Sequence, residues 1–166
     1  MITDKVPVRL AAKAVNDELS IGIVVSFDAR WLEPISEGHI RLVLRKRVPR
    51  SALPKWMYIY INNPASVLLG RAPIKKTLTM SRAEALKRQD ELVLTNGEIS
   101  DYLRGSDAIG AYELGRTEIA RNPLRLNWLQ ENMAFHPPQS FFYLASAAQA
   151  FIDKHAGFLP PGEKAK

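Results

Sequence analysis

A run of basic residues is the part of the sequence whose side-chain types most clearly indicate chemistry. The segment from His39 to Lys55 contains no acidic residue. Its cations are Arg41, Arg45, Lys46, Arg47, Arg50 and Lys55. A guanidinium group can hold a phosphate with two donors, and an ammonium group adds a point charge. The run therefore predicts a phosphate-binding surface. The alternative is a solvated edge strand whose charges prevent aggregation.

Aromatic residues directly follow the basic run. Trp56, Tyr58 and Tyr60 come next in the chain, and aromatic rings beside cations are what single-stranded bases need for stacking. The alternative is that Trp56 and Tyr58 close a small barrel. Further cations follow at Arg71, Lys75, Lys76, Lys87 and Arg88, whereas the segment from Asp90 to Glu118 is net acidic. We therefore expect a molecule with segregated charge.

Composition limits the classes of protein to be considered. The 166 residues are 46% hydrophobic and carry a formal net charge of +6, which indicates one folded domain with an anionic partner. The chain has no cysteine, which excludes disulfides, thiol chemistry, iron–sulfur clusters and thiolate zinc sites. Its three histidines are scattered, and no phosphate-cradling glycine loop, serine elbow or HExxH motif is present. We expect neither a metal nor another cofactor.

The sequence gives no indication of a membrane protein. Residues 1–13 lack the regions of a signal peptide, and no apolar stretch approaches the length of a membrane span. We therefore expect a cytoplasmic protein that does not contact membranes. The oligomeric state is left open.

The elements that must position the basic run are short strands and helices in irregular alternation. Alternating or continuous apolar residues predict strands at 21–27, 40–45, 57–62 and 108–114, an aromatic strand within 135–144, and a long or bent strand over 66–80. Gly70 and Pro73 are its expected bend points. Helices are predicted over 29–37, 82–89, 97–104, 126–133 and 145–155, with Asp28 and Ser81 as N-caps and Gly38 as a C-terminal stop. This pattern predicts an α+β domain on a small mixed sheet or barrel.

Several of these residues resemble the ASCH family of small PUA-like proteins. The resemblance covers about residues 21–144, and no single part of it is a highly specific signature. It is carried by Ser26, Ile35, Gly38, Arg45, Lys46, Arg47, Pro49, Ile59, Tyr60, Pro64, Gly70 and the segment Pro137–Leu144. The resemblance implies a small PUA-like mixed β-barrel with short flanking helices over 21–144. Residues 1–20 would then be an N-terminal extension, and residues 145–166 a C-terminal helix and flexible tail.

The same resemblance implies a cleft for RNA or a nucleotide-like ligand. Arg45, Lys46, Arg47 and Tyr60 would lie at or near that cleft, and Gln139 and Ser140 would offer polar contacts. Together with the basic run, the expected nucleic-acid-binding residues are Arg41, Arg45, Lys46, Arg47, Arg50, Tyr60, Arg71, Gln139 and Ser140.

Catalysis is the second hypothesis. Relatives that are acetylcytidine amidohydrolases use a lysine two positions after the turn glycine and a hydroxyl or carboxylate three positions further on. Ile40 and Val43 stand there in this chain, and neither can act as nucleophile, acid or base. A ribonuclease would have Lys46 and Tyr60 as its candidate catalytic residues. We favour a binding or regulatory module over a hydrolase. A protein-interaction or small-anion-binding regulator is the third alternative.

Overall fold

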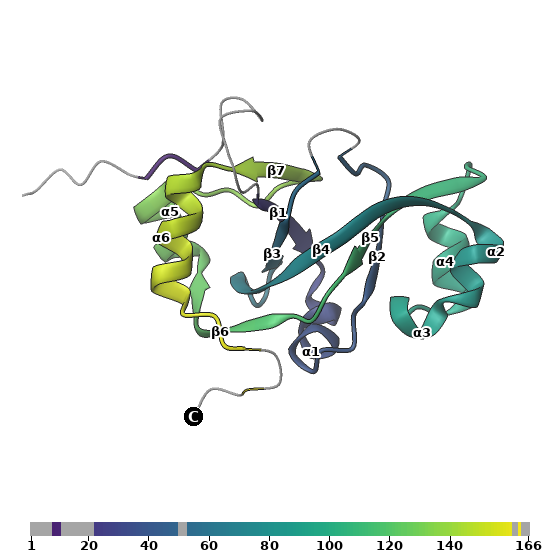
Figure 1. The fold of residues 1–166 in the computed structure, drawn as a ribbon, viewed down its shortest axis with the longest axis horizontal. Helices are drawn as coiled ribbons and strands as arrows, with labels where there is room; N and C mark the ends of the chain where they lie inside the picture. The colour runs from purple at the N-terminus through teal and green to yellow at the C-terminus, as the bar shows by residue number, and fades with distance from the viewer. Residues whose placement is uncertain (1–7, 11–21, 50–52, 161–162, 164–166) are drawn as a thin grey trace, which may run out of the picture.

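The computed structural model (Figure 1) describes residues 8–10, 22–49, 53–160 and 163. Most of the expected N-terminal extension, part of the C-terminal tail and Arg50 lie outside these residues. The domain boundaries at 20 and 145 therefore stay predictions.

Seven strands form one sheet with mixed pairing. The strands are β1 (Gly22–Phe27), β2 (Leu42–Arg45), β3 (Trp56–Ile61), β4 (Val67–Ser81), β5 (Ala108–Leu114), β6 (Glu118–Arg125) and β7 (Phe141–Leu144). Their order is β2-β5-β4-β3-β1-β7, and β6 pairs with β4 beside this path. Strands β1 and β3 run parallel, and the other pairs are antiparallel. The α+β class and the mixed sheet are confirmed. Within the described residues the path does not close, because β2 and β7 end it unpaired with each other.

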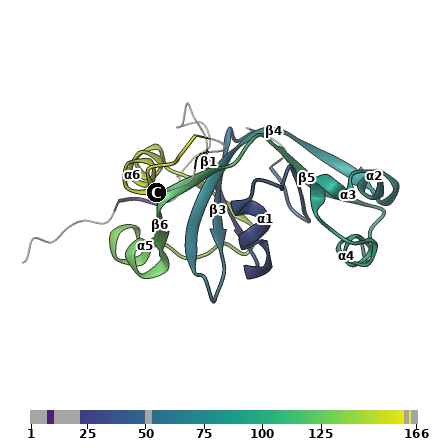
Figure 2. The same ribbon diagram turned by 90° about the horizontal axis from the view of Figure 1, so that it is seen from below.

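Most of the helices lie at the two ends of the molecule, and α1 (Leu32–Ser36) lies between them (Figure 1). The helices are the 3₁₀ turn η2 (Ala29–Trp31), α1, α2 (Arg82–Lys87), α3 (Gln89–Leu92), α4 (Asn96–Tyr102), α5 (Leu126–Met133) and α6 (Ser146–Ala156). Figures 1 and 2 show α5 and α6 at one end of the molecule and α2, α3 and α4 at the other. No helix in the described part of the chain is both long enough and apolar enough to cross a bilayer.

Most of the local signals are confirmed, with three differences. Ser81 accepts a hydrogen bond from the Glu84 main-chain nitrogen at 3.2 Å, and Gly38 has a φ of +74°, as a C-terminal stop requires. The predicted helix over 29–37 is wrong in detail, because a 3₁₀ turn precedes α1 and the Asp28 side chain makes no cap hydrogen bond. Sequence reasoning also missed the short helix α3 and the strand β6.

Strand β4 links the two halves of the sheet. Its first part pairs with β3 and β6, and its second part pairs with β5. The predicted irregularity at Gly70 is confirmed by a register shift between Leu68 and Gly70 on the β6 side. A Cβ atom at Gly70 would lie 2.5 Å from the Glu118 carbonyl oxygen, so only glycine permits this close crossing.

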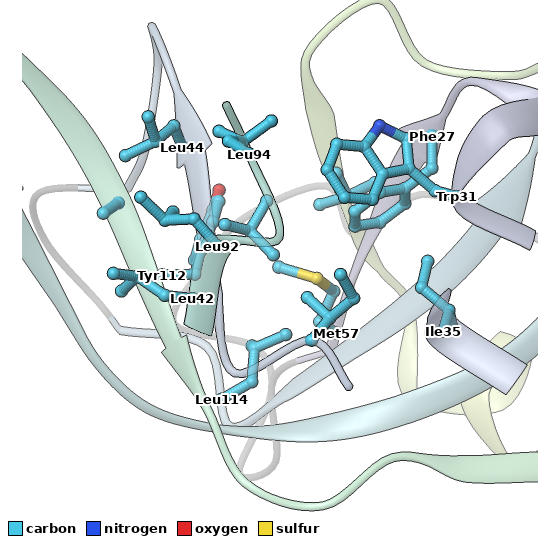
Figure 3. Close-up of a cluster of buried hydrophobic side chains, with 14 of the residues drawn as sticks. Phe27, Trp31, Ile35, Leu42, Leu44, Met57, Leu92, Leu94, Tyr112 and Leu114 are labelled. Atoms are coloured by element: carbon cyan, nitrogen blue, oxygen red, sulfur yellow. The ribbon is translucent and has the colours of Figure 1, made fainter. Parts of the chain in front are cut away.

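The apolar core has two clusters, one on each side of β3. Met57, Ile59 and Ile61 belong to the first cluster, part of which is shown in Figure 3, and Tyr58 and Tyr60 belong to the second. Both faces of this strand are therefore covered, which agrees with the alternation of residues 57–62 but gives its aromatic face no exposure to solvent.

Candidate nucleic-acid interface

A basic groove of about 940 Å³ lies beside the end of β2. It is formed by the segment that follows β2, the paired strands β4 and β5, and the end of α4 with the residues that follow it. The lining residues are Lys46, Arg47, Val48, Pro49, Thr77, Leu78, Thr79, Tyr102, Arg104, Ser106, Ala108, Ile109 and Gly110. We call this feature the basic groove.

Gly110 of β5 determines how closely the segment that follows β2 packs against β5. It pairs with Arg45 of β2 on one side and with Thr79 of β4 on the other. A Cβ atom at this position would lie 2.9 Å from both the Arg45 carbonyl oxygen and a Val48 methyl group. Glycine therefore allows the segment carrying Lys46 and Arg47 to pack directly against β5.

The charge of the groove is positive. Lys46, Arg47 and Arg104 are exposed, and no carboxylate belongs to the lining. Arg104 contacts Asp101 at 2.8 Å, but both side chains are largely exposed, so the pair is weak and exchangeable. The hydroxyls of Thr77, Thr79 and Ser106 add neutral hydrogen-bonding groups. Three cations beside neutral donors are suited to a phosphate backbone.

Only part of the predicted basic set reaches this groove. Lys46 and Arg47 line it, whereas the Arg41 guanidinium donates to the carbonyls of Gly38 and Ile40 at 2.8 and 3.1 Å. Arg50 lies outside the described residues. Arg45 lies beneath the groove surface, beside Tyr102, and not among the lining residues.

Arg71 is in a different environment, among aromatic rings and carboxylates. Its guanidinium donates to Glu118 at 2.7 Å and lies 3.3 Å from Asp153. It also lies over the rings of Trp56 and Phe158, at 4.1 and 4.9 Å from their centroids. Two carboxylates already satisfy this cation, so the expectation that Arg71 shares a concave basic site with Lys46 and Arg47 is not met.

Tyr60 is also separated from the basic groove. Its side chain is only 1% exposed and packs on Phe135 with 5.2 Å between ring centroids. Burial raises the pKa of Tyr60, and a side-chain hydrogen bond with Ser66 acts in the opposite direction. The ring is therefore not presented for stacking. The two catalytic candidates, Lys46 and Tyr60, do not face a common space.

The remaining predicted contacts also lie elsewhere. Gln139 is exposed and Ser140 half-buried in the loop before β7, and neither lines the groove. Ile40 and Val43 are 3% and 4% exposed, so the positions that would hold amidohydrolase groups are part of the apolar core.

A smaller cleft of about 400 Å³ lies near the Tyr60 side of the sheet. Its lining residues are Pro64, Ala65, Ser66, Arg125, Leu126, Asn127 and Gln130. Ser66 is the hydroxyl-bearing residue of this lining and Arg125 is its exposed cation, whereas the buried Tyr60 does not line the cleft.

Sequence reasoning missed Arg104 and the threonines of the basic groove. Thr77 and Thr79 could have been found, because alternate residues of a strand share a face. Arg104 could not, because it lies within the net acidic segment and reaches the groove only through the packing of α4.

The comparisons with known proteins agree with this fold. Over 123 residues the chain is 28% identical to a protein named ASCH domain-containing ribonuclease from Zymomonas mobilis subsp. mobilis, with 73% of this chain and 82% of the relative covered. No protein-family model matches the chain.

Solved structures of a Zymomonas mobilis protein are also similar. The crystal structure of its ASCH protein has a TM-score of 0.71 at 25% identity, covering 80% of this chain and 94% of that one. A serine-to-alanine variant of that protein has a TM-score of 0.73 at 24% identity, covering 81% and 95%. A tyrosine-to-phenylalanine variant has a TM-score of 0.73 at 24% identity, covering 80% and 96%.

Proposed function

Because this chain is an ASCH-domain protein of PUA-like fold, we propose that it binds single-stranded RNA in the basic groove. The observation that carries the proposal is the convergence of Lys46, Arg47 and Arg104 on one concave surface that no carboxylate lines. A similar protein is named a ribonuclease, which supports RNA over other polyanions.

The groove favours a single strand over a duplex for a physical reason. The A-form duplex presents a wide, shallow minor groove and is recognised mainly by shape, whereas the bases of an unpaired strand are free to contact aromatic side chains. Tyr102 is half-buried at the groove and is the aromatic residue of its lining that could contact a base. Phosphates would then lie along the exposed cations.

The test is the salt dependence of binding to a labelled single-stranded RNA of about 10 nucleotides, followed by fluorescence anisotropy. The Lys46→Ala/Arg47→Ala variant is expected to bind more weakly. It should also lower the slope of log affinity against log salt by about 1.4, because each lost phosphate contact contributes about 0.7 for a single strand.

A charge-matched control keeps net charge from explaining the result. Arg121 in β6 and Lys154 in α6 are exposed, and α6 lies at the end of the molecule opposite α4 (Figure 1). The Arg121→Ala/Lys154→Ala variant removes the same charge and is expected to keep the wild-type slope. Equal losses in the two double variants would show that the groove is not the binding site.

RNA cleavage is the second candidate function, and the name of the Zymomonas relative favours it. The smaller cleft is its better location, because the hydroxyl-bearing Ser66 and the exposed Arg125 line it together. Incubation of labelled RNA with the wild-type protein and with Ser66→Ala, with and without chelator, tests it. Product formed by the wild type and reduced in Ser66→Ala supports cleavage at this cleft. Undegraded RNA with the wild type overturns this candidate.

A further inference from the structure

Tyr102, the last residue of α4, borders two spaces. It belongs to the lining of the basic groove and also to the lining of a small inner cavity. Apart from Arg45, the other residues of the inner cavity are apolar: Phe27, Trp31, Ile40, Leu42, Val43, Leu44, Leu92 and Leu94. Tyr102 is half-buried, so its ring packs on the apolar core and still borders the groove.

Arg45 holds the hydroxyl group of this tyrosine. Both residues line the inner cavity, and a side-chain hydrogen bond joins them. A guanidinium has donors only, so the Tyr102 hydroxyl oxygen accepts. Arg45 belongs to β2 and Tyr102 to α4, so this bond ties the ring to the sheet as well as to its own helix.

Arg45 is itself fixed by groups of the sheet. Its guanidinium donates to the carbonyls of Leu44 and Ser26 at 2.8 and 2.9 Å and lies over the Phe27 ring, 4.6 Å from the centroid. In the part of the chain that the structure describes, no carboxylate lies within ion-pair distance of Arg45. No carboxylate there draws the guanidinium away from the Tyr102 hydroxyl.

A ring held in this way is suited to stacking with a base. An ordered side chain loses little conformational freedom when a ligand packs on it. Stacking on aromatic side chains is a main source of affinity for unpaired strands, because every base has a face to offer. Lys46 and Arg47 follow Arg45 directly in the chain, and all of the groove's three cations line it together with Tyr102. A base on this ring would therefore have cations beside it for its phosphates.

We propose that one unpaired base of the bound strand stacks on Tyr102 and that Arg45 is the positioning residue that holds the ring. The inference rests on the proposed function and adds that the ligand of the groove must carry bases as well as phosphates. A polyanion without bases would meet the cations only. Arg45 does not line the groove, so it acts through Tyr102 and not by touching the strand.

The experiment compares two oligomers of about ten nucleotides by fluorescence anisotropy: a single-stranded RNA, and a chain of the same length whose riboses carry no bases. We expect the wild type to bind the RNA about tenfold more tightly, as stacking of one base on an aromatic side chain provides. Tyr102→Leu keeps an apolar side chain against the core but removes the ring. It is expected to lower this preference to about twofold or less and to keep the wild-type dependence of affinity on salt.

The role of Arg45 is tested by coupling to Tyr102. Tyr102→Phe keeps the ring and removes the oxygen that Arg45 binds, and Arg45→Met removes the guanidinium. Each is expected to lower the preference to about threefold, and the double variant to the same value, because both changes break one bond. A purely structural role of Arg45 would instead lower the free energy of unfolding and leave the preference at about tenfold. Tyr58→Phe removes a hydroxyl that donates to Asp153 outside the groove, and it should keep the preference.

The possible failures are distinguishable. If Arg45→Met does not fold, Tyr102→Phe decides the role of Arg45, and an unchanged preference in that variant overturns it. Equal binding of the two oligomers by the wild type, or a preference that Tyr102→Leu keeps, overturns the stacking. The proposed function survives that result if Lys46→Ala/Arg47→Ala still weakens both oligomers, whereas absence of binding to either oligomer overturns both proposals.

Discussion

Arg45 of β2 donates an N–H group to the main-chain oxygen of Ser26 in β1 across 2.9 Å, although β1 and β2 are not paired in the sheet. A second N–H group of the same guanidinium binds the Leu44 carbonyl at 2.8 Å. One side chain thus connects two strands that the ladder of main-chain hydrogen bonds leaves apart. This link gives Arg45 a structural role in addition to its hydrogen bond with Tyr102.

The Arg45→Lys substitution tests that structural role. Lysine keeps the charge but lacks the planar fork that reaches two carbonyls and stacks on Phe27. Since each hydrogen bond contributes about 1 kcal/mol, we expect the free energy of unfolding to fall by about 2 kcal/mol. Urea denaturation measures it.

Arg41→Lys is the matched control for this measurement. Arg41 also binds two carbonyls, but they belong to Gly38 and Ile40 in its own segment, so no separate strands are joined. We expect a loss about 1 kcal/mol smaller than that of Arg45→Lys, because Arg41 lacks the one hydrogen bond that joins β2 to β1. Equal losses in the two variants would show that the connection between β1 and β2 contributes nothing.

Gly110→Ala is expected to damage both stability and RNA binding. The added methyl group would lie 2.9 Å from the Arg45 carbonyl oxygen and from Val48, which moves the wall that carries Lys46 and Arg47. Overpacking of this kind costs about 1–3 kcal/mol. Urea denaturation and the anisotropy assay measure the two effects.

Gly97→Ala supplies the contrasting result. Gly97 lies in α4, and the nearest atom to an added Cβ is the Thr95 hydroxyl oxygen at 3.9 Å. Alanine favours a helix by about 1 kcal/mol over glycine, so this variant should be as stable as the wild type or more stable. A Gly110→Ala protein that behaves like Gly97→Ala would contradict the close-packing argument.

The elements of the fold could be predicted because their signals are local. Alternation defines β3, and the serine-to-glutamate spacing defines the start of α2. Strand β4 could be predicted as long, but its two sets of partners could not, because β5 and β6 join it from far along the chain.

The site could be predicted only in part, for the same reason. Lys46 and Arg47 share the groove because they are neighbours at the end of β2. The difference between Arg45 and Arg71 depends on distant carboxylates: Glu118 is 47 residues from Arg71, whereas no carboxylate described by the structure pairs with Arg45. Spacing along the chain carries no information about such pairs.

Thr95 holds the start of the helix that ends at the groove. It forms a capping box in α4: its side chain accepts from the Glu98 nitrogen at 3.2 Å, and the Glu98 carboxylate accepts from the Thr95 nitrogen at 3.2 Å. Loss of such a cap costs about 1 kcal/mol. We expect Thr95→Ala to lower the Tm by about 2–4 °C in calorimetry. Thr95→Ser keeps the hydroxyl and should melt within a degree or so of the wild type, and a similar drop in both variants would exclude the cap as the cause.

Asp153 gives the chain a pH dependence that can be isolated. Burial is the main cause that raises its pKa above the usual 3.8, and the hydrogen bond from Tyr58 and the charge of Arg71 act in the opposite direction. In the unfolded chain the Asp153 carboxyl has its usual pKa. At pH values between this pKa and the raised pKa of the folded state, the folded protein therefore binds more protons than the unfolded chain. A fall in pH through the folded pKa therefore favours folding through this group, and a rise in pH removes that contribution.

The side chain at position 153 cannot titrate in Asp153→Asn. The difference in unfolding free energy between the wild type and this variant therefore isolates the contribution of Asp153. Urea denaturation at a series of values from about pH 6 to about pH 4 should show the difference in unfolding free energy moving in favour of the wild type as the pH falls. Asp90→Asn makes the same change of side chain at an exposed position that has no ion pair among the described residues, and it serves as the matched control. If acidification instead stabilises Asp153→Asn relative to the wild type, the ion pair with Arg71 outweighs burial. The pKa of Asp153 would then be lowered in the folded protein, not raised.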